Sequence, residues 1–417
     1  MEPRAPSRLK RREIVLLLIG LVIVLWTYRS SGGAPPVAPS AIALRVAALE
    51  PLDAGGSPAY VWLGWALVGL GSIVGNYPPD QVLRILSILA GLLSGVALYF
   101  AYRALFSNIY IGVVPAALLV FSPLSFSLST TVERYGIGIL FITVAVWAWT
   151  TGRWLIWGGF AGLALAVHPA SATAVLPFLA TTSWPRRKAS ELWQPVAALS
   201  LMLVVVLVGY GWVASRLGGL STWWQNLVSA ELAYFLDAAA WPAITATPLL
   251  AVVFVLVTIV GVFAIFVPKR TGGKSFVLSL VITALLFVFL VAANFGLIAR
   301  LAGLFLVLLS TLSVPVLWIV EQRRQQLVFL LLWMLPSLLA LWFVRQSGSA
   351  LLLFTIAPLA LMASRLIDRS LDGQWLDYWW ALGLPTKWYY RLLKLFVLAM
   401  LVLLVVQATG VSLDALV

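Results

Sequence analysis

Apolar runs long enough to cross a bilayer recur along almost the whole chain and constrain its fold more than any other feature. A transmembrane helix needs about 20 predominantly apolar residues. Of the 417 residues, 62% are hydrophobic and 10% are charged, whereas about a quarter are charged in an average soluble protein. A soluble globular fold is therefore excluded. The sequence predicts an all-α integral membrane protein.

The apolar runs predict thirteen transmembrane helices, some of them shorter than the usual span. They cover residues 14–28, 84–105, 109–126, 133–150, 154–167, 170–184, 194–215, 246–267, 275–293, 297–320, 326–344, 348–367 and 393–412. The first run follows a basic start and could be a cleaved signal peptide. We favour an uncleaved anchor, because a protein with many spans needs no removable signal.

Charge decides how the apolar segment 58–77 is interpreted. If it lies on the outer side as a juxtamembrane or re-entrant helix and the N-terminus is inside, 20 of the 27 Lys and Arg residues, Arg365 among them, are cytoplasmic. A fourteenth crossing there would invert the later loops and oppose the positive-inside bias. A second juxtamembrane helix is expected in the fourth outer loop.

This topology predicts a multi-pass plasma-membrane protein with a cytoplasmic N-terminus. It divides the chain into four parts. They are the cytoplasmic N-terminus 1–13, a transmembrane domain 14–367 with outer loops 29–83 and 217–245, a cytoplasmic interfacial segment 368–392, and 393–417 with the last span and an outer C-terminus.

The net charge of +13 would suggest nucleic acid as a partner in a soluble protein. Here the basic residues form short clusters between apolar runs, which is typical of topology determinants and leaves no continuous basic face. Nucleic acid is therefore not expected as a partner. The chain has no cysteine, which excludes disulfides, thiolate metal sites and cysteine nucleophiles.

The ionisable residues that could carry chemistry gather at the outer ends of the spans and in the outer loops. They are Glu133, Arg134, His168, Arg300 and Arg345 at span ends, and Glu50, Asp53, Asp80, Glu231 and Asp237 in the outer loops. An ion-coupled transporter would instead place carboxylates near the midplane of both halves of a repeat. A carboxylate can act as general base on an acceptor hydroxyl while arginines bind a phosphate leaving group. The alternative is that these residues are ordinary solvated loop charges.

Five short motifs occur in a fixed order along the sequence, and the predicted topology places them at the outer face. They are Gly56 to Tyr60, Leu83 to Ser87, Phe121 to Pro123 with Thr131 to Tyr135, Gly159 to Pro169, and Arg345 to Leu361. In order and sidedness they resemble motifs of the GT-C superfamily, polytopic membrane glycosyltransferases that use polyprenyl-phosphate sugars as donors. The T-V-E-R-Y stretch is similar to the A-E-x-Y form of the branch related to protein O-mannosyltransferases. The resemblance covers about residues 50–180 and 340–365.

The resemblance implies roles for several of the candidate residues. The first outer loop would supply the catalytic acid, Glu133 would orient the donor or a metal, and Arg134, His168 and Arg345 would bind the donor phosphate. A divalent cation such as Mg²⁺ or Mn²⁺ is a candidate cofactor, although some GT-C enzymes need none. The late motif lacks the tyrosine of the family pattern.

One departure from the family pattern concerns the catalytic acid itself. Relatives with the A-E-x-Y form carry a D-x-x-E pair soon after the first span, but no acid occurs here between Glu13 and Glu50. Either Glu50 or Asp53 has replaced that pair, or the chain has kept the scaffold and lost its base.

We therefore expect transfer of a sugar, with mannose as the candidate, from a polyprenyl phosphate to a protein or glycan acceptor outside the cytoplasm. The expected partners are the lipid-linked donor, the acceptor and membrane lipids. The alternative is a catalytically inactive GT-C-like subunit or a lipid-linked-saccharide transporter.

Overall fold

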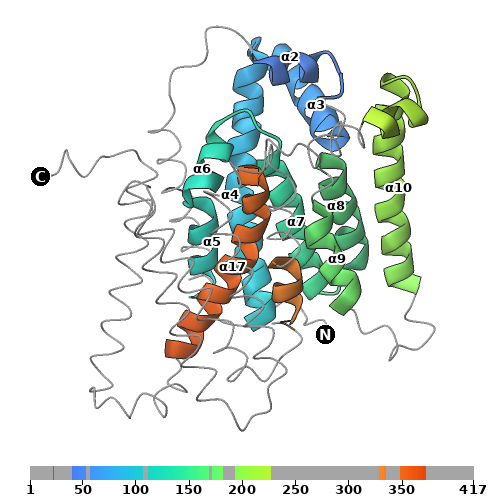
Figure 1. The fold of residues 1–417 in the computed structure, drawn as a ribbon. Helices are drawn as coiled ribbons and strands as arrows, with labels where there is room; N and C mark the ends of the chain where they lie inside the picture. The colour runs from blue at the N-terminus through green and yellow to red at the C-terminus, as the bar shows by residue number, and fades with distance from the viewer. Residues whose placement is uncertain are drawn as a thin grey trace, which may run out of the picture.

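The computed structural model describes residues 22, 40–52, 57–106, 111–168, 171–181, 193–226, 326, 328–334 and 348–371. The regular structure within these segments is helical, and the long helices run side by side as a bundle (Figure 1). The helices are α2 (Ala41–Ala47), α3 (Pro58–Gly75), α4 (Pro79–Phe106), α5 (Val113–Val120), α6 (Pro123–Thr130), α7 (Tyr135–Thr150), α8 (Trp154–Val167), α9 (Ala172–Thr181), α10 (Trp193–Arg216) and α17 (Gly348–Leu371).

The predicted spans match these helices closely. The span predicted at 154–167 coincides with α8, and those at 84–105 and 194–215 lie within α4 and α10. In the described part of the chain, α3, α4 and α10 are long and apolar enough to cross a membrane. The helical fold is thus confirmed for the described residues. The number of thirteen spans stays a prediction, because many of the predicted spans lie outside the described residues.

The span predicted at 109–126 is divided into two helices. Helix α5 ends at Val120 and α6 begins at Pro123. Proline has no N–H to donate and disfavours helical backbone in the residue before it, and Ser122 is accordingly extended, with ψ 137°. Proline is well suited to the first position of the new helix. The chain therefore reaches the loop before α7 through the short helix α6.

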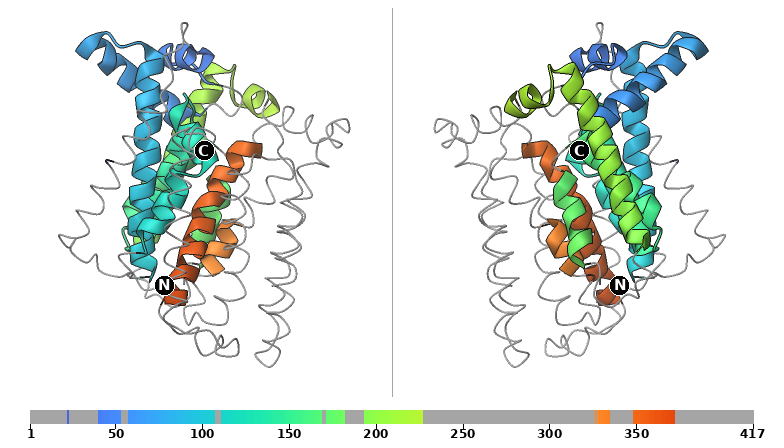
Figure 2. Two further views of the ribbon diagram at one scale, coloured as in Figure 1. Left: turned by 90° about the vertical axis from the view of Figure 1, so that its left-hand side faces the viewer. Right: turned by 90° about the vertical axis from the view of Figure 1, so that its right-hand side faces the viewer.

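Helices α2 and α3 lie at the upper end of the bundle as drawn in Figure 1, where Pro79 begins α4, Tyr135 begins α7 and Val167 ends α8. Figure 2 shows that α3 stays at this end and does not run along the length of α4. This arrangement agrees with the juxtamembrane helix expected at 58–77. Its position at a membrane surface stays a prediction, since α3 also has the length of a span.

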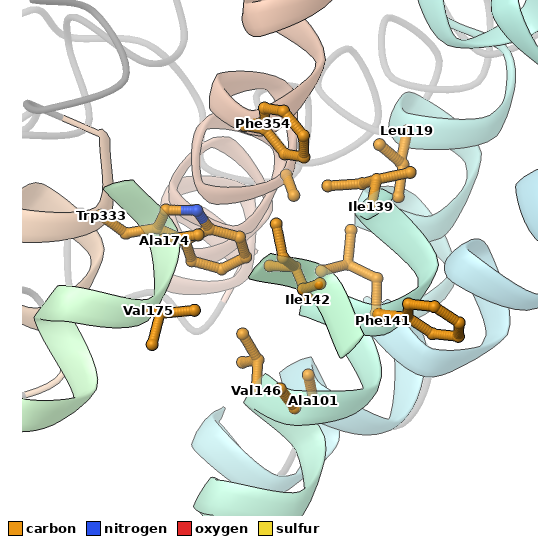
Figure 3. Packing of buried hydrophobic residues seen from close by; sticks show 14 of the residues in the cluster. Ala101, Leu119, Ile139, Phe141, Ile142, Val146, Ala174, Val175, Trp333 and Phe354 are labelled. Atoms are coloured by element: carbon orange, nitrogen blue, oxygen red, sulfur yellow. The ribbon is translucent and has the colours of Figure 1, made fainter. Parts of the chain in front are cut away.

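Helix α7 lies at the centre of the packed core. Its side chains Ile139 and Ile142 are 0% and 1% exposed. Figure 3 shows them among Leu119 of α5, Ala174 of α9 and Phe354 of α17. Lipid tails are as apolar as these side chains, so helices in a membrane associate through close packing more than through the hydrophobic effect. Helix α17, although distant in sequence, completes this packing.

Two glycines bring α8 and α10 into close contact. A Cβ atom added at Gly158 would collide with the carbonyl of Ala198, and one added at Gly162 would lie 2.9 Å from the carbonyl oxygen of Met202. Small residues four positions apart let two membrane helices approach backbone to backbone. The pair therefore determines the distance between α8 and α10.

Replacing Gly158 with alanine is expected to lower the thermal unfolding temperature in detergent, with a loss of about 1–3 kcal/mol from overpacking. The new methyl group must push against backbone atoms of Ala198, which cannot rotate away. Gly159→Ala is the matched control, because its Cβ would meet Leu201 at an ordinary 3.7 Å and alanine favours helix by about 0.5–1 kcal/mol. Equal unfolding temperatures for both variants would contradict the packing argument.

A buried ionic network joins α17 to α4 at the lower end. An Arg365 Nη1 donates to Asp368 Oδ2 at 2.6 Å, and the Tyr102 hydroxyl donates to the same oxygen at 3.1 Å. The Arg365 guanidinium also lies 4.6 Å from the ring centroid of Phe106. Helix α17 extends past the predicted end of its span at 367 to Leu371. The first residues of the predicted interfacial segment 368–392 are therefore the last turn of this helix, and the rest lies outside the described residues.

Candidate active site

The loop between α6 and α7 carries Glu133 and Arg134 at the upper end of the bundle. An Arg134 Nη1 donates to the Ser57 hydroxyl at 2.7 Å. The Ser87 hydroxyl of α4 lies 3.4 Å from the Glu133 carbonyl oxygen and donates to it. Ser57 is 1% exposed and directly precedes α3. These contacts attach the loop of Glu133 to the first turn of α3 and to α4.

Burial raises the pKa of the Glu133 carboxyl, and the Arg134 guanidinium and the Arg134 backbone N–H partly oppose that rise. Desolvation disfavours the charged form of a carboxyl group, while a nearby cation or a hydrogen-bond donor favours it. A raised carboxyl pKa is common at catalytic and ligand-binding positions, although structural ion pairs also perturb pKa values. Glu133 therefore differs from a solvated loop carboxylate.

His168 ends α8 at the same end of the bundle. Its ring centroid lies 5.4 Å from that of Tyr135, the residue after Arg134. Its backbone is extended, with φ −157° and ψ 132°, and its carbonyl accepts the Ser171 N–H at 2.9 Å. This turn directs the chain from α8 into α9. The structure thus brings His168 next to the loop of Glu133 and Arg134, and its predicted role in binding the donor phosphate stays a prediction.

The two first-loop acids are placed differently. Glu50 follows α2, its side chain is exposed, and its backbone N–H donates to the Arg45 carbonyl at 2.9 Å. The Arg45 guanidinium donates to the carbonyls of Pro51 and Leu52, which holds this part of the loop against α2. Asp53 lies outside the described residues, as does Arg345 in the second half of the chain.

Two further residues at this end did not enter the predicted site. Asp80 is 7% exposed and accepts the Ser40 N–H at 2.9 Å and the Ser40 hydroxyl at 2.6 Å. It thereby connects the start of α2 to the start of α4. Tyr60 is 0% exposed, and its hydroxyl has no hydrogen-bond partner among the described residues. The only sequence signal for Tyr60 is its place in the G-S-P-A-Y motif, and Asp80 has no signal beyond being an outer-loop acid.

The acidic residues of the described segments do not fit a metal centre. No group of three or more His, Cys, Asp or Glu side chains in the described part of the chain could hold an ion. Asp80 uses its two carboxylate oxygens to bind Ser40. The Mg²⁺ or Mn²⁺ considered from the sequence therefore finds no ligand set among these residues.

Comparison with known proteins gives one family match and several structural matches. The family model of dolichyl-phosphate-mannose-protein mannosyltransferases matches residues 57–212, which is less than half of the chain. A comparison with curated proteins finds no match. The matched region contains α3 to α9 and most of α10, and thus the loop of Glu133 and Arg134.

The structural matches cover almost the whole chain at low sequence identity. The oligosaccharyltransferase of Archaeoglobus fulgidus tethered to an acceptor peptide matches with a TM-score of 0.58, 17% identity, and coverage of 96% of this chain and 55% of that chain. The same enzyme solved with zinc and sulfate matches with a TM-score of 0.55 and 16% identity, and the match covers 94% of this chain and 53% of that chain. ArnT from Cupriavidus metallidurans bound to undecaprenyl phosphate matches with a TM-score of 0.55 and 12% identity, and the match covers 95% of this chain and 74% of that chain.

These matches establish the fold. The chain has the fold of GT-C glycosyltransferases, and the resemblance seen in its motifs is confirmed. The protein is accordingly a membrane protein. It spans about half the length of the archaeal oligosaccharyltransferase.

Proposed function

We propose that this protein is a membrane glycosyltransferase that transfers a sugar, with mannose as the candidate, from a polyprenyl phosphate to a protein or glycan acceptor on the extracytoplasmic side. The observation that carries the proposal is the gathering of Glu133, Arg134 and His168 at one end of a GT-C bundle. A fold by itself does not define a function. The mannosyltransferase family match and the undecaprenyl phosphate bound to ArnT both support a lipid-linked donor.

The reaction is a single displacement at the anomeric carbon. A first-loop carboxylate, Asp53 or Glu50, removes the proton from the acceptor hydroxyl, and the oxygen attacks that carbon. The bond between the carbon and the phosphate oxygen breaks, and the polyprenyl phosphate leaves with the electron pair. In-line attack inverts the anomeric configuration. Glu133 orients the donor sugar in this scheme.

Cationic groups stabilise the phosphate as negative charge develops on it. Arg134 and Arg345 supply guanidinium groups, which suit phosphate because their N–H groups can bind two oxygens at once. His168, beside Tyr135 at the end of α8, supplies a further donor. Charge stabilisation of this kind is usually among the largest contributions to catalysis.

The direction of α17 supports a role for Arg345 at the same end. A Cβ atom added at Gly138, in the first turn of α7, would lie 3.4 Å from the Phe354 ring. Asp368 meets Tyr102 at the opposite end, so α17 runs from the upper end to the lower end. Arg345 precedes the first residue of α17, Gly348, by only three positions.

Exposed apolar side chains on α10 support contact with membrane lipids. Leu203, Val204, Leu207 and Val208 are each 54% to 61% exposed. A helix with such a surface is stable only in an apolar surrounding. We propose a multi-pass plasma-membrane location with the N-terminus in the cytoplasm and the upper end of the bundle outside.

The experiment that tests the function uses the purified full-length protein in lipid nanodiscs. It is mixed with a panel of polyprenyl-phosphate sugars and acceptor peptides or glycans, and both the released polyprenyl phosphate and the glycosylated acceptor are measured. We expect one donor to be consumed and one acceptor to gain a sugar. Donor binding without release would support the inactive subunit or transporter. Absence of binding to every donor would refute both functions.

A further inference from the structure

Tyr60 is a buried tyrosine whose hydroxyl has no hydrogen-bond partner among the described residues. Its side chain is 0% exposed, and its hydroxyl makes no hydrogen bond to any residue that the structure describes. Nearly all buried polar groups in proteins are hydrogen-bonded, so an exception at a candidate site suggests a function. Tyr60 lies in the first turn of α3, three residues after Ser57, which binds Arg134.

The electrostatic environment of this phenol includes charged groups from two other elements. Glu133 and Arg134 of the loop before α7 and Asp80 of α4 all interact electrostatically with Tyr60. Asp80 already accepts two hydrogen bonds from Ser40, one on each carboxylate oxygen. The Glu133 carboxylate accepts the Arg134 backbone N–H, and a carboxylate has about four acceptor positions. Glu133 is therefore the better acceptor for the Tyr60 hydroxyl.

We propose that Tyr60 is a positioning residue of the active site, whose hydroxyl donates a hydrogen bond to the Glu133 carboxylate when the donor is bound. The contact of Arg134 with Ser57 already holds the loop of Glu133 against the first turn of α3. Tyr60 then keeps Glu133 directed toward the donor sugar. This inference rests on the proposed function.

The bond has a consequence for the ionisation of Glu133. Burial raises the pKa of this carboxyl, whereas a hydrogen bond donated to the ionised form lowers it. Loss of the Tyr60 hydroxyl therefore raises the Glu133 pKa further. The protonated, inactive form then persists to higher pH. Among the described residues, the charged groups that act on Glu133 or on Tyr60 are Arg134 from the same loop and Asp80 from α4.

The test is a pH series on the full-length Tyr60→Phe variant in nanodiscs. We expect the acidic limb of kcat at saturating donor, which reports ionisation in the donor complex, to move to higher pH by about one unit, which is the effect of roughly 1.4 kcal/mol. Far above this limb, KM for the donor stays close to that of the parent protein. The infrared band of the protonated Glu133 carboxyl, identified by subtraction of a Glu133→Gln spectrum, should titrate with the same shift when polyprenyl phosphate is present.

Tyr99→Phe is the matched control. Tyr99 is a tyrosine of α4 that is 1% exposed and stacks edge-on against Phe100. Its replacement removes a buried hydroxyl without touching the loop of Glu133, and its pH profile should equal that of the parent. The unfolding temperatures of both variants show whether either change has altered the fold.

The possible outcomes separate the inference from the proposed function. An unchanged pH profile and an unchanged infrared midpoint in Tyr60→Phe would overturn the inference, as would a lower unfolding temperature with no shift in either. A shifted infrared midpoint in a protein that transfers no sugar would support the hydrogen bond and refute the catalytic function. Shifts in both measurements would support both.

Discussion

Removal of the catalytic base is expected to slow sugar transfer by about two to four orders of magnitude, which is the usual contribution of a general base. The variants are Asp53→Asn and Glu50→Gln, and we expect the larger effect for Asp53. Asp53 precedes Ser57, the partner of Arg134, by four residues, and four residues span at most about 14 Å. Glu50 is exposed and three residues further away.

The measurement is the single-turnover rate of transfer, together with the affinity for the donor. Amide side chains keep the size of the acids but cannot accept a proton, so donor binding should change little. Each variant is the other's control, because both acids belong to the same loop. A large effect of Glu50→Gln alone would assign the base to Glu50. Parental rates for both variants would eliminate the first-loop base.

Breaking the buried ion pair of α17 is expected to destabilise the protein by about 3–5 kcal/mol, because the remaining charge stays buried without its partner. The variant is Asp368→Ala. Asp368 is 1% exposed and binds both Arg365 and Tyr102. The loss leaves the Arg365 guanidinium in a site where it is 7% exposed. Thermal unfolding in detergent gives the size of the effect.

The double variant Arg365→Met, Asp368→Leu is the control for this prediction. It removes both charges at once, and replacing a buried ion pair by apolar side chains of similar volume is often neutral or stabilising. Tyr102 retains the carbonyl of Ser364 as an acceptor, at 3.3 Å. We expect the double variant to recover most of the unfolding temperature. If it is as unstable as Asp368→Ala, the pair itself contributes a net stabilisation.

Helix positions were largely predictable because hydropathy is a local property of the sequence. The span predicted at 154–167 has the bounds of α8, and the fold class agrees with the GT-C matches. The division of 109–126 into α5 and α6 was missed, although Pro123 signals it. An apolar run is counted by composition, whereas a proline acts through the geometry of the backbone.

The network at the lower end could not be derived from the sequence. Hydropathy assigned Arg365 to the cytoplasmic charges and Asp368 to the start of the interfacial segment 368–392. In the structure both lie inside α17 and are buried against α4. Besides Arg365, Asp368 binds Tyr102, which is 266 positions away in the sequence. No local pattern links residues at that separation.

The end of the bundle that carries the candidate site was predictable from sequence order. Glu133, Arg134 and His168 lie at ends of neighbouring spans, and the alternation of spans places these ends together. The contact between Arg134 and Ser57, across 77 positions, was not predictable, nor was the buried hydroxyl of Tyr60. The predictions for Asp53 and Arg345 stay untested, because both residues lie outside the described segments.

The amino-acid sequence alone determined that this chain is a helical membrane protein with its ionisable residues at the ends of the helices, because lipid excludes unpaired charge and unsatisfied backbone from its interior. Only the tertiary structure decided which of those residues meet. The glycines of α8 act at its contact with α10, and the hydrogen bond from Tyr102 to Asp368 joins α4 to α17. Their effects depend on distances that only the packed bundle defines.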